Sequence, residues 1–143
     1  MKIARPFLLT LALFLTAFPA VAADWVLVAN PKSGITHLEK DDVTNIFLGR
    51  YRRLPSGATA EPIDQPADSA LKASFYRQLV NKDMSEINAY WSRLVFSGKT
   101  RPPFIAASSE DAIQQVSVNQ SALAYVEKSK VDARVLVVFE IKE

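Results

Sequence analysis

The stretch DVTNIFLGRYRRLPSGATAEPIDQPADSALKASF, residues 42–75, decides the fold because it joins two helices through a basic loop and a short strand. The first helix ends in apolar residues and stops at Gly49, a residue that commonly terminates helices. Three arginines, a Pro-Ser-Gly turn and a strand candidate around Ile63 follow. The second helix opens at Asp68-Ser69. Free backbone N–H groups at such a helix start attract anions, so this stretch predicts a place where an oxyanion docks.

The rest of the chain alternates short strands with helices, as its apolar spacing shows. Trp25 to Ala29 is a continuous apolar run, typical of a strand buried on both faces. Leu71, Phe75 and Leu79 recur every four residues, as on one face of a helix. Further strands are predicted at 60–64, 104–107, 121–126 and 134–141, and further helices after the capping patterns Thr36–Glu39, Asp83–Glu86 and Ser108–Asp111. This alternation predicts an α/β fold, a mixed, mostly parallel sheet flanked by helices.

The first 23 residues have the layout of a cleavable secretory signal. Lys2 and Arg5 precede an apolar run, and small residues fill the end of the segment at 20–23. An uncleaved anchor is the alternative, since residues 6–23 are about long enough to span a bilayer. The small residues favour cleavage. We therefore expect residues 24–143 to form one domain, periplasmic or otherwise secreted, without stable membrane insertion.

Composition excludes several classes of protein. The first 23 residues carry two of the 17 basic side chains and none of the 15 acidic ones, which leaves 15 of each in the rest of the chain. This balance argues against nucleic acid as a partner. Without cysteine, the chain has no disulfide and no thiolate metal site. His37 is the only histidine and belongs to no ligand or nucleophile pattern, so we expect no enzyme, no metal and no cofactor.

Two separated motifs resemble one protein family. The helix end at 46–49, followed by the loop, the strand and the helix start at Ser69, is similar to the "IF.G" and Ser-Gly-Thr motifs of substrate-binding proteins of phosphate ABC transporters. The segment ALAYV at 122–126 resembles the "GAIGYV" strand of the same family. The resemblance implies a solute-binding protein, with a single lobe of the type II periplasmic-binding fold over residues 24–143.

The resemblance also implies phosphate or another small oxyanion as the ligand. Ser69 takes the position of the serine in the Ser-Gly-Thr motif, whereas Ala70 and Leu71 replace its glycine and threonine. Gln65 stands where the family often has a phosphate-pairing arginine. The alternative for Ser69 is a simple helix cap, a role that serine fills routinely.

Two loops supply further candidate donors. Arg50 could replace the missing guanidinium, because an arginine fork matches two oxygens of an anion. Ser33, in a Lys-Ser-Gly loop after the first strand, is another donor. Micromolar affinity needs about 8 kcal/mol, whereas a helix-terminus contact supplies about 0.3–1 kcal/mol. We therefore expect either a homodimer that rebuilds a binding cleft or a chain that no longer serves as a transporter receptor.

A second hypothesis is a protein-interaction module that keeps the lobe as a scaffold and has lost ligand binding. Its contact surface would combine Arg52 and Arg53 with the helix that carries Trp91, since arginine and aromatic side chains are typical interface anchors. The expected partner is an ABC permease under the first hypothesis and another envelope protein under the second.

Overall fold

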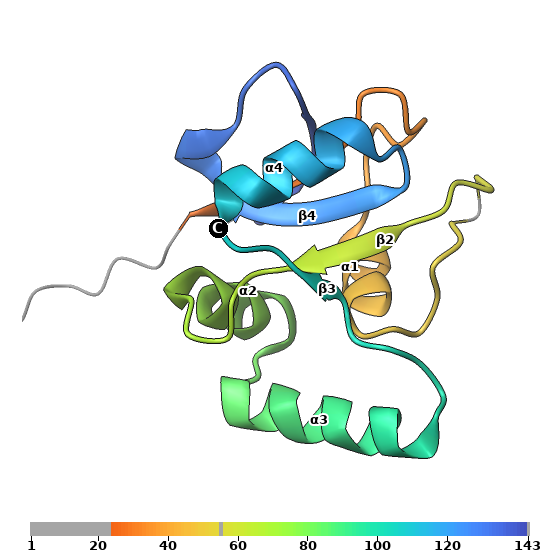
Figure 1. The fold of residues 1–143 in the computed structure, drawn as a ribbon, viewed down its shortest axis with the longest axis vertical. Helices are drawn as coiled ribbons and strands as arrows, with labels where there is room; N and C mark the ends of the chain where they lie inside the picture. The colour runs from red at the N-terminus through yellow and green to blue at the C-terminus, as the bar shows by residue number, and fades with distance from the viewer. Residues whose placement is uncertain (1–23, 55, 143) are drawn as a thin grey trace, which may run out of the picture.

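A computed structural model describes residues 24–54 and 56–142, which form one sheet with helices on both faces (Figure 1). The proposed signal segment, residues 1–23, lies outside these described residues. In chain order the elements are β1 (Trp25–Ala29), α1 (Lys40–Phe47), β2 (Glu61–Asp64), α2 (Ala70–Val80), α3 (Met84–Ser97), β3 (Phe104–Ile105), α4 (Ser109–Val118), β4 (Ala122–Glu127), a short 3-10 helix (Lys128–Lys130) and β5 (Leu136–Glu140).

The sheet is mixed, as predicted, with the strand order β3-β2-β4-β1-β5. β2 runs parallel to both β3 and β4, whereas β1 runs antiparallel to β4 and β5. The parallel strands are joined by helices, because a parallel pair needs a crossover connection. The carboxyl ends of β2 and β3 therefore lie at the same edge of the sheet, and α2 and α4 begin just beyond them.

The core has two parts, one on each face of the sheet. The odd-numbered residues of β1 pack with α1, α2 and α3, and its even-numbered valines pack with α4. β1 is thus buried on both faces, as its continuous apolar run predicts. On the first face the rings of Phe75 and Tyr125 stack, with their centroids 3.7 Å apart. This packing attaches α2 firmly to β4 and holds the start of α2 in place.

The predicted helix starts are confirmed at Ser69, Asp83 and Ser108. The predicted capping box of Thr36 and Glu39 is wrong, because α1 begins at Lys40 and its capping box consists of Glu39 and Asp42. The reason lies in the tertiary structure: the N–H of Leu38 donates to the carbonyl of Val138 in β5 at 2.9 Å. That bond keeps the chain extended until Glu39.

Three strands are shorter than predicted, β2 by its first residue and β3 and β5 by more. The N–H of Ala106 still donates to the carbonyl of Asp64 at 2.9 Å, but the next N–H, of Ala107, donates to the Asp111 carboxylate at 2.8 Å. β3 is consequently limited to Phe104–Ile105. β5 begins at Leu136, which is the first residue to pair with β1.

Within residues 24–54 and 56–142, no helix combines the length and the apolar character that crossing a membrane requires.

Candidate functional site

The corner between β2 and α2 contains three of the predicted binding residues, Gln65, Ser69 and Ala70. β2 ends at Asp64, the N–H of Ser69 donates to the carbonyl of Pro66 at 2.9 Å, and α2 begins at Ala70. The N–H groups of Ala70 and Leu71 have no carbonyl one turn earlier to bind, because they are the first residues of the helix. With the positive end of the helix dipole, these donors make the β2–α2 corner favourable for an anion.

Ser69 caps α2. Its Oγ accepts a hydrogen bond from the N–H of Lys72 at 3.3 Å, which confirms the capping role. This bond uses a lone pair of the hydroxyl and leaves its proton free to donate. The exposed Asp68 beside it places a negative charge at the same corner. Capping is therefore compatible with a contact to an anion, and Asp68 weakens that contact.

Gln65 is buried, with only 3% of its surface exposed. Its side-chain Nε2 donates to the carbonyl of Tyr125 at 3.0 Å, and its backbone N–H donates to the Tyr125 hydroxyl at 3.1 Å. The side chain joins the end of β2 to β4. It is thus held inside the protein and does not occupy the outer surface of the corner, where a ligand would bind.

A buried charge cluster that was not predicted from the sequence lies beneath the corner. The carboxylate of Asp64 accepts hydrogen bonds from the hydroxyls of Tyr76, at 2.8 Å, and of Tyr125. Lys72 Nζ lies 3.4 Å from Asp64 Oδ2, and the two side chains are only 10% and 5% exposed. The sequence feature that could have indicated this cluster is the spacing of Lys72 and Tyr76, which lie four residues apart on one face of α2.

The cluster balances its own charge. A buried carboxylate loses much of its hydration and needs several hydrogen bonds and an opposite charge to compensate. Burial, and then the nearby charge of Asp64, raise the pKa of Tyr76 well above its ordinary value, and the same causes raise the pKa of Tyr125. Both phenols therefore remain protonated and donate to Asp64. Because Lys72 is already paired, it adds little attraction for an external anion.

The arginine loop lies at the opposite end of β2 from this corner. The carbonyl of Arg52 accepts from the N–H of Ala60 at 2.7 Å, just before β2 begins. The four residues of β2 extend over about 13 Å. Arg50 Nη1 donates to Asn45 Oδ1 at 3.0 Å, near the end of α1. β2 therefore separates Arg50 from Ser69, and the structure does not bring the two residues together.

Ser33 also lies away from the corner. It follows β1, whose last residue, Ala29, pairs with Leu123 near the amino end of β4. Its Oγ accepts from the N–H of Ile35 at 3.1 Å and so closes a local turn. Antiparallel pairing sends the end of β1 to the other edge of the sheet, so the structure does not bring Ser33 together with Ser69.

The loop at 50–53 instead meets α3 and the segment that follows it. The hydroxyl of Tyr90 donates to the carbonyl of Leu48 at 2.6 Å. Arg52 Nη2 donates to the carbonyl of Arg101 at 2.8 Å. The structure thus brings together the two segments that the interaction hypothesis combines, the arginine loop and the helix of Trp91.

Trp91 itself belongs to the core. It is 9% exposed and packs against Gly49, where an added Cβ would lie 2.8 Å from Trp91 Cη2. Its position four residues after the buried Ile87 puts it on the inner face of α3. The aromatic side chain that α3 presents to solvent is Phe96, which is 96% exposed. Trp91 is therefore corrected from a surface anchor to a packing residue.

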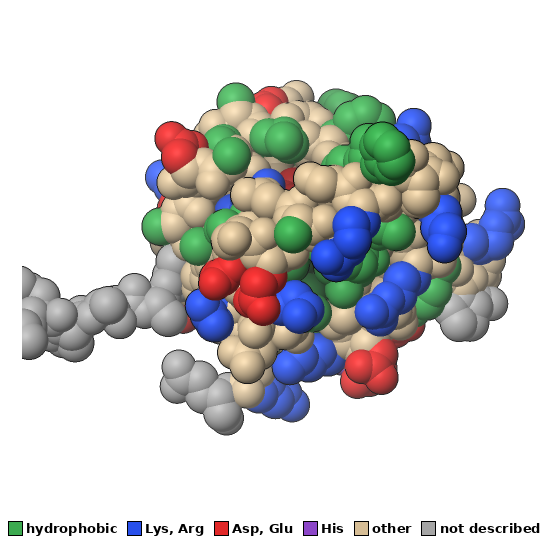
Figure 2. All heavy atoms as spheres, turned by 90° about the horizontal axis from the view of Figure 1, so that it is seen from below, with side chains coloured by type: hydrophobic (Ala, Val, Ile, Leu, Met, Phe, Trp, Pro, Cys, Tyr) green, Lys and Arg blue, Asp and Glu red, His purple; other side chains and the backbone are tan. Residues whose placement is uncertain are grey.

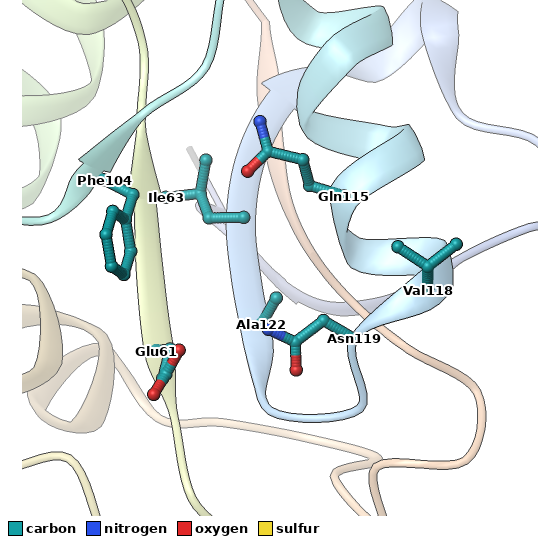
Figure 3. Close-up of a pocket in the computed structure, with 7 residues that line it drawn as sticks. All are labelled: Glu61, Ile63, Phe104, Gln115, Val118, Asn119 and Ala122. Carbon is teal, nitrogen blue, oxygen red and sulfur yellow. The ribbon is translucent and has the colours of Figure 1, made fainter.

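A groove of about 420 Å³ lies between β3 and α4 (Figure 3). Its lining residues are Glu61, Ile63, Phe104, Gln115, Val118, Asn119 and Ala122. None of the predicted site residues is among them. Glu61 is the one charged side chain of the lining, and its carboxylate repels anions. The groove is consequently not a second oxyanion site.

This arrangement defines the class of fold. A five-stranded mixed sheet between helices, with a helix starting at the carboxyl end of a parallel strand, is the architecture of one lobe of a periplasmic substrate-binding protein.

Solved structures of phosphate receptors share this fold. An ABC-type phosphate transport receptor from Vibrio cholerae is 14% identical, with a TM-score of 0.64 over 81% of this chain and 45% of that one. A structure from Clostridium perfringens, assigned to a phosphate ABC transporter substrate-binding protein with bound phosphate, is 17% identical, with a TM-score of 0.64 over 81% and 44%. PstS from Borrelia burgdorferi is 15% identical, with a TM-score of 0.62 over 85% and 49%.

The chain therefore spans about half the length of these structures. At sequence identities this low, the structural similarity shows a shared fold and nothing more. A scan against protein-family models and a search of curated proteins find no match to the sequence.

Proposed function

We propose that this chain is a solute-binding module that takes phosphate or another small oxyanion at the β2–α2 corner. The observation that carries the proposal is the start of α2 beyond the carboxyl end of β2, where the Ser69 hydroxyl and the N–H groups of Ala70 and Leu71 are available as donors. Solved structures of phosphate receptors with this fold, one of them with bound phosphate, support it. The proposed role is transport, without catalysis.

Binding at this corner is expected to be weak. Three donors face the ligand, Asp68 opposes it, and the charge of Lys72 is neutralised by Asp64. Helix-terminus interactions at an exposed site contribute about 0.3–1 kcal/mol, whereas millimolar affinity already corresponds to about 4 kcal/mol. We therefore propose that the isolated chain binds no more tightly than in the millimolar range.

The proposal includes a location and partners. Residues 1–23 would direct export, and an ABC permease would receive the ligand. Tighter binding would require a second surface that closes over the corner, supplied by another copy of the chain in a homodimer or by a second lobe.

A titration followed by nuclear magnetic resonance tests the site directly. The purified, nitrogen-15-labelled chain would be titrated with inorganic phosphate, sulfate and acetate. The amide signals of Ala70 and Leu71 are expected to shift with a dissociation constant on the order of 1–10 mM. Ser69→Ala is expected to weaken binding several-fold because it removes one of the three donors.

Arg50→Ala and Ser33→Ala are the matched controls, since both residues lie at the other edge of the sheet. They are expected to leave the titration unchanged. Ala70 and Leu71 signals that stay fixed at saturating phosphate, or shifts confined to the arginine loop, would exclude the β2–α2 corner as the site.

A further inference from the structure

Exposed apolar side chains and unpaired cations share one face of the protein, which we call the α3 surface. Its members are Arg52, Val95, Phe96, Lys99, Arg101 and Phe104. Phe96 is 96% exposed, and Val95 and Phe104 are each 52% exposed. Single exposed apolar residues are ordinary, but several on one face commonly mark an interaction site. Figure 2 looks onto this face and shows Lys and Arg side chains gathered with apolar side chains among them.

Basic side chains predominate on this surface, and Glu61 is an acidic neighbour of Arg52. The segment from Arg93 to Arg101 contains three basic residues and no acidic one. None of the ion pairs found within residues 24–54 and 56–142 involves Arg52, Lys99 or Arg101. Burial, and then repulsion by Arg101, lower the pKa of Arg52, and Glu61 opposes this effect. The surface therefore offers guanidinium and ammonium groups that lack a carboxylate partner.

The arginine part of the α3 surface is held in a defined shape. The Arg52 guanidinium donates to the Arg101 carbonyl at 2.8 Å, and the Arg101 guanidinium lies 5.2 Å from the centre of the Phe104 ring. Beside Phe96 is a hollow of about 560 Å³, lined by Asn88, Trp91, Ser92, Val95 and Phe96. Side chains that are ordered before binding lose less entropy on association. Such a surface favours a specific contact.

We propose that the α3 surface binds an acidic segment of another protein, with an apolar side chain of that segment seated in the hollow beside Phe96. Carboxylates of the segment would pair with Arg52, Lys99 and Arg101, since arginine binds carboxylates in two-pronged geometry. This proposal goes beyond oxyanion binding and uses none of the residues of the β2–α2 corner.

Two other occupants fit the α3 surface less well. A second copy of the chain meeting this face through a two-fold axis would place like charges opposite one another, which is unfavourable. A membrane would take the apolar part into lipid, where the polar residues Asn88 and Ser92 in the lining are unfavourable. An acidic protein segment matches both the charge and this mixed polar and apolar lining.

Site-specific photo-crosslinking in the source cells tests the proposal. The full chain would carry p-benzoylphenylalanine at position 96 or, as the matched control, at position 118, where Val118 is 75% exposed at the end of α4. Position 96 is expected to yield a protein adduct whose linked peptide has an excess of Asp and Glu. Position 118 is expected not to yield that adduct.

Charge reversal then separates a specific contact from chance proximity. The double variant Lys99→Glu, Arg101→Glu is expected to reduce the yield of the adduct at position 96 at least about tenfold, equivalent to about 1.4 kcal/mol. Ser69→Ala is expected to leave it unchanged, so this test and the oxyanion test fail independently. Circular dichroism would show that each variant is folded. An adduct with lipid or with a second copy, a yield that is insensitive to charge reversal, or no adduct at position 96 would overturn the proposal.

Discussion

The β2–α2 corner and the α3 surface both contain basic residues, yet they differ in where the opposite charge lies. At the corner, Lys72 is buried against Asp64, and two tyrosine hydroxyls donate hydrogen bonds to the same carboxylate. On the α3 surface, Lys99 and Arg101 are exposed and have no acidic partner among the described residues. The corner therefore uses its charges for stability, whereas the α3 surface leaves its charges available to another molecule.

Removal of the buried carboxylate is expected to have the largest effect. Asp64→Ala leaves Lys72 charged and unpaired and removes the acceptor of two tyrosine hydroxyls, so the free energy of unfolding should fall by about 3–5 kcal/mol. Urea denaturation followed by circular dichroism measures this loss. Lys99→Glu on the α3 surface is the comparison and should change the free energy by less than about 0.5 kcal/mol. Equal effects at the two positions would remove the distinction between the regions.

Alkaline pH should lower the free energy of unfolding through the two tyrosines at the corner. The pKa values of Tyr76 and Tyr125 are raised in the folded protein, so the folded state retains protons that the unfolded chain releases above about pH 10. Their stabilisation is complete below pH 10 and is lost as the pH rises beyond it. The loss should be about 1.4 kcal/mol per pH unit for each tyrosine.

Urea denaturation at a series of alkaline pH values, with phenolate absorbance recorded in parallel, would measure this slope. Tyr76→Phe should reduce the slope by about half, since one of the two groups no longer titrates. Phenolate absorbance that appears before unfolding would show that the tyrosines are not protected.

The contact between the arginine loop and α3 should depend on Gly49. This residue has φ of 71°, and an added Cβ would lie 2.8 Å from Trp91 Cη2. Gly49→Ala is therefore expected to lower the free energy of unfolding by about 1–3 kcal/mol. Gly34→Ala is a matched control with φ of 78° and open space around its Cβ position, so its cost should be about 1 kcal/mol. Thermal melts of both variants measure the difference. A melting temperature that falls at least as far in Gly34→Ala as in Gly49→Ala would contradict the close packing at Gly49.

The smallest effects are expected at the exposed residues of the two regions. Ser69→Ala removes the cap of α2 and should cost about 1 kcal/mol. Phe96→Ser removes a side chain with almost no packing and should stay within about 0.5 kcal/mol of the parent chain. Urea denaturation of the two variants side by side compares them. A larger loss for Phe96→Ser would mean that Phe96 contributes to the core and is not reserved for a partner.

Local features of the sequence predicted most of the helices and strands correctly. β1 was evident from its continuous apolar run, and the start of α3 from its capping pattern. The errors arose where a distant strand controls the chain. The start of α1 depends on a bond to Val138 of β5, and β3 ends because Ala107 binds Asp111. Neither bond can be read from the spacing of nearby residues.

The candidate site was less predictable than the fold. Ser69 was recognised because a helix cap is a local pattern, and its bond to Lys72 stays within one turn. The pair of Asp64 and Lys72 was missed, because recognising it requires knowing that the end of β2 lies against α2. Phe96 was missed in favour of Trp91, since the three aromatic residues of this helix do not themselves show which face is buried.

The sequence by itself determined the order and type of the elements, the apolar faces, the helix start at Ser69 and the basic character of residues 50–53. Each of these depends on residues a few positions apart. Only the tertiary structure decided which of them meet: sheet topology placed Arg52 beside Arg101 and set it apart from Ser69 by the length of β2. Long-range packing also buried the charge of Lys72 against Asp64. The physical reason is that strand pairing and burial depend on the whole chain, whereas caps and periodicity depend on one turn of it.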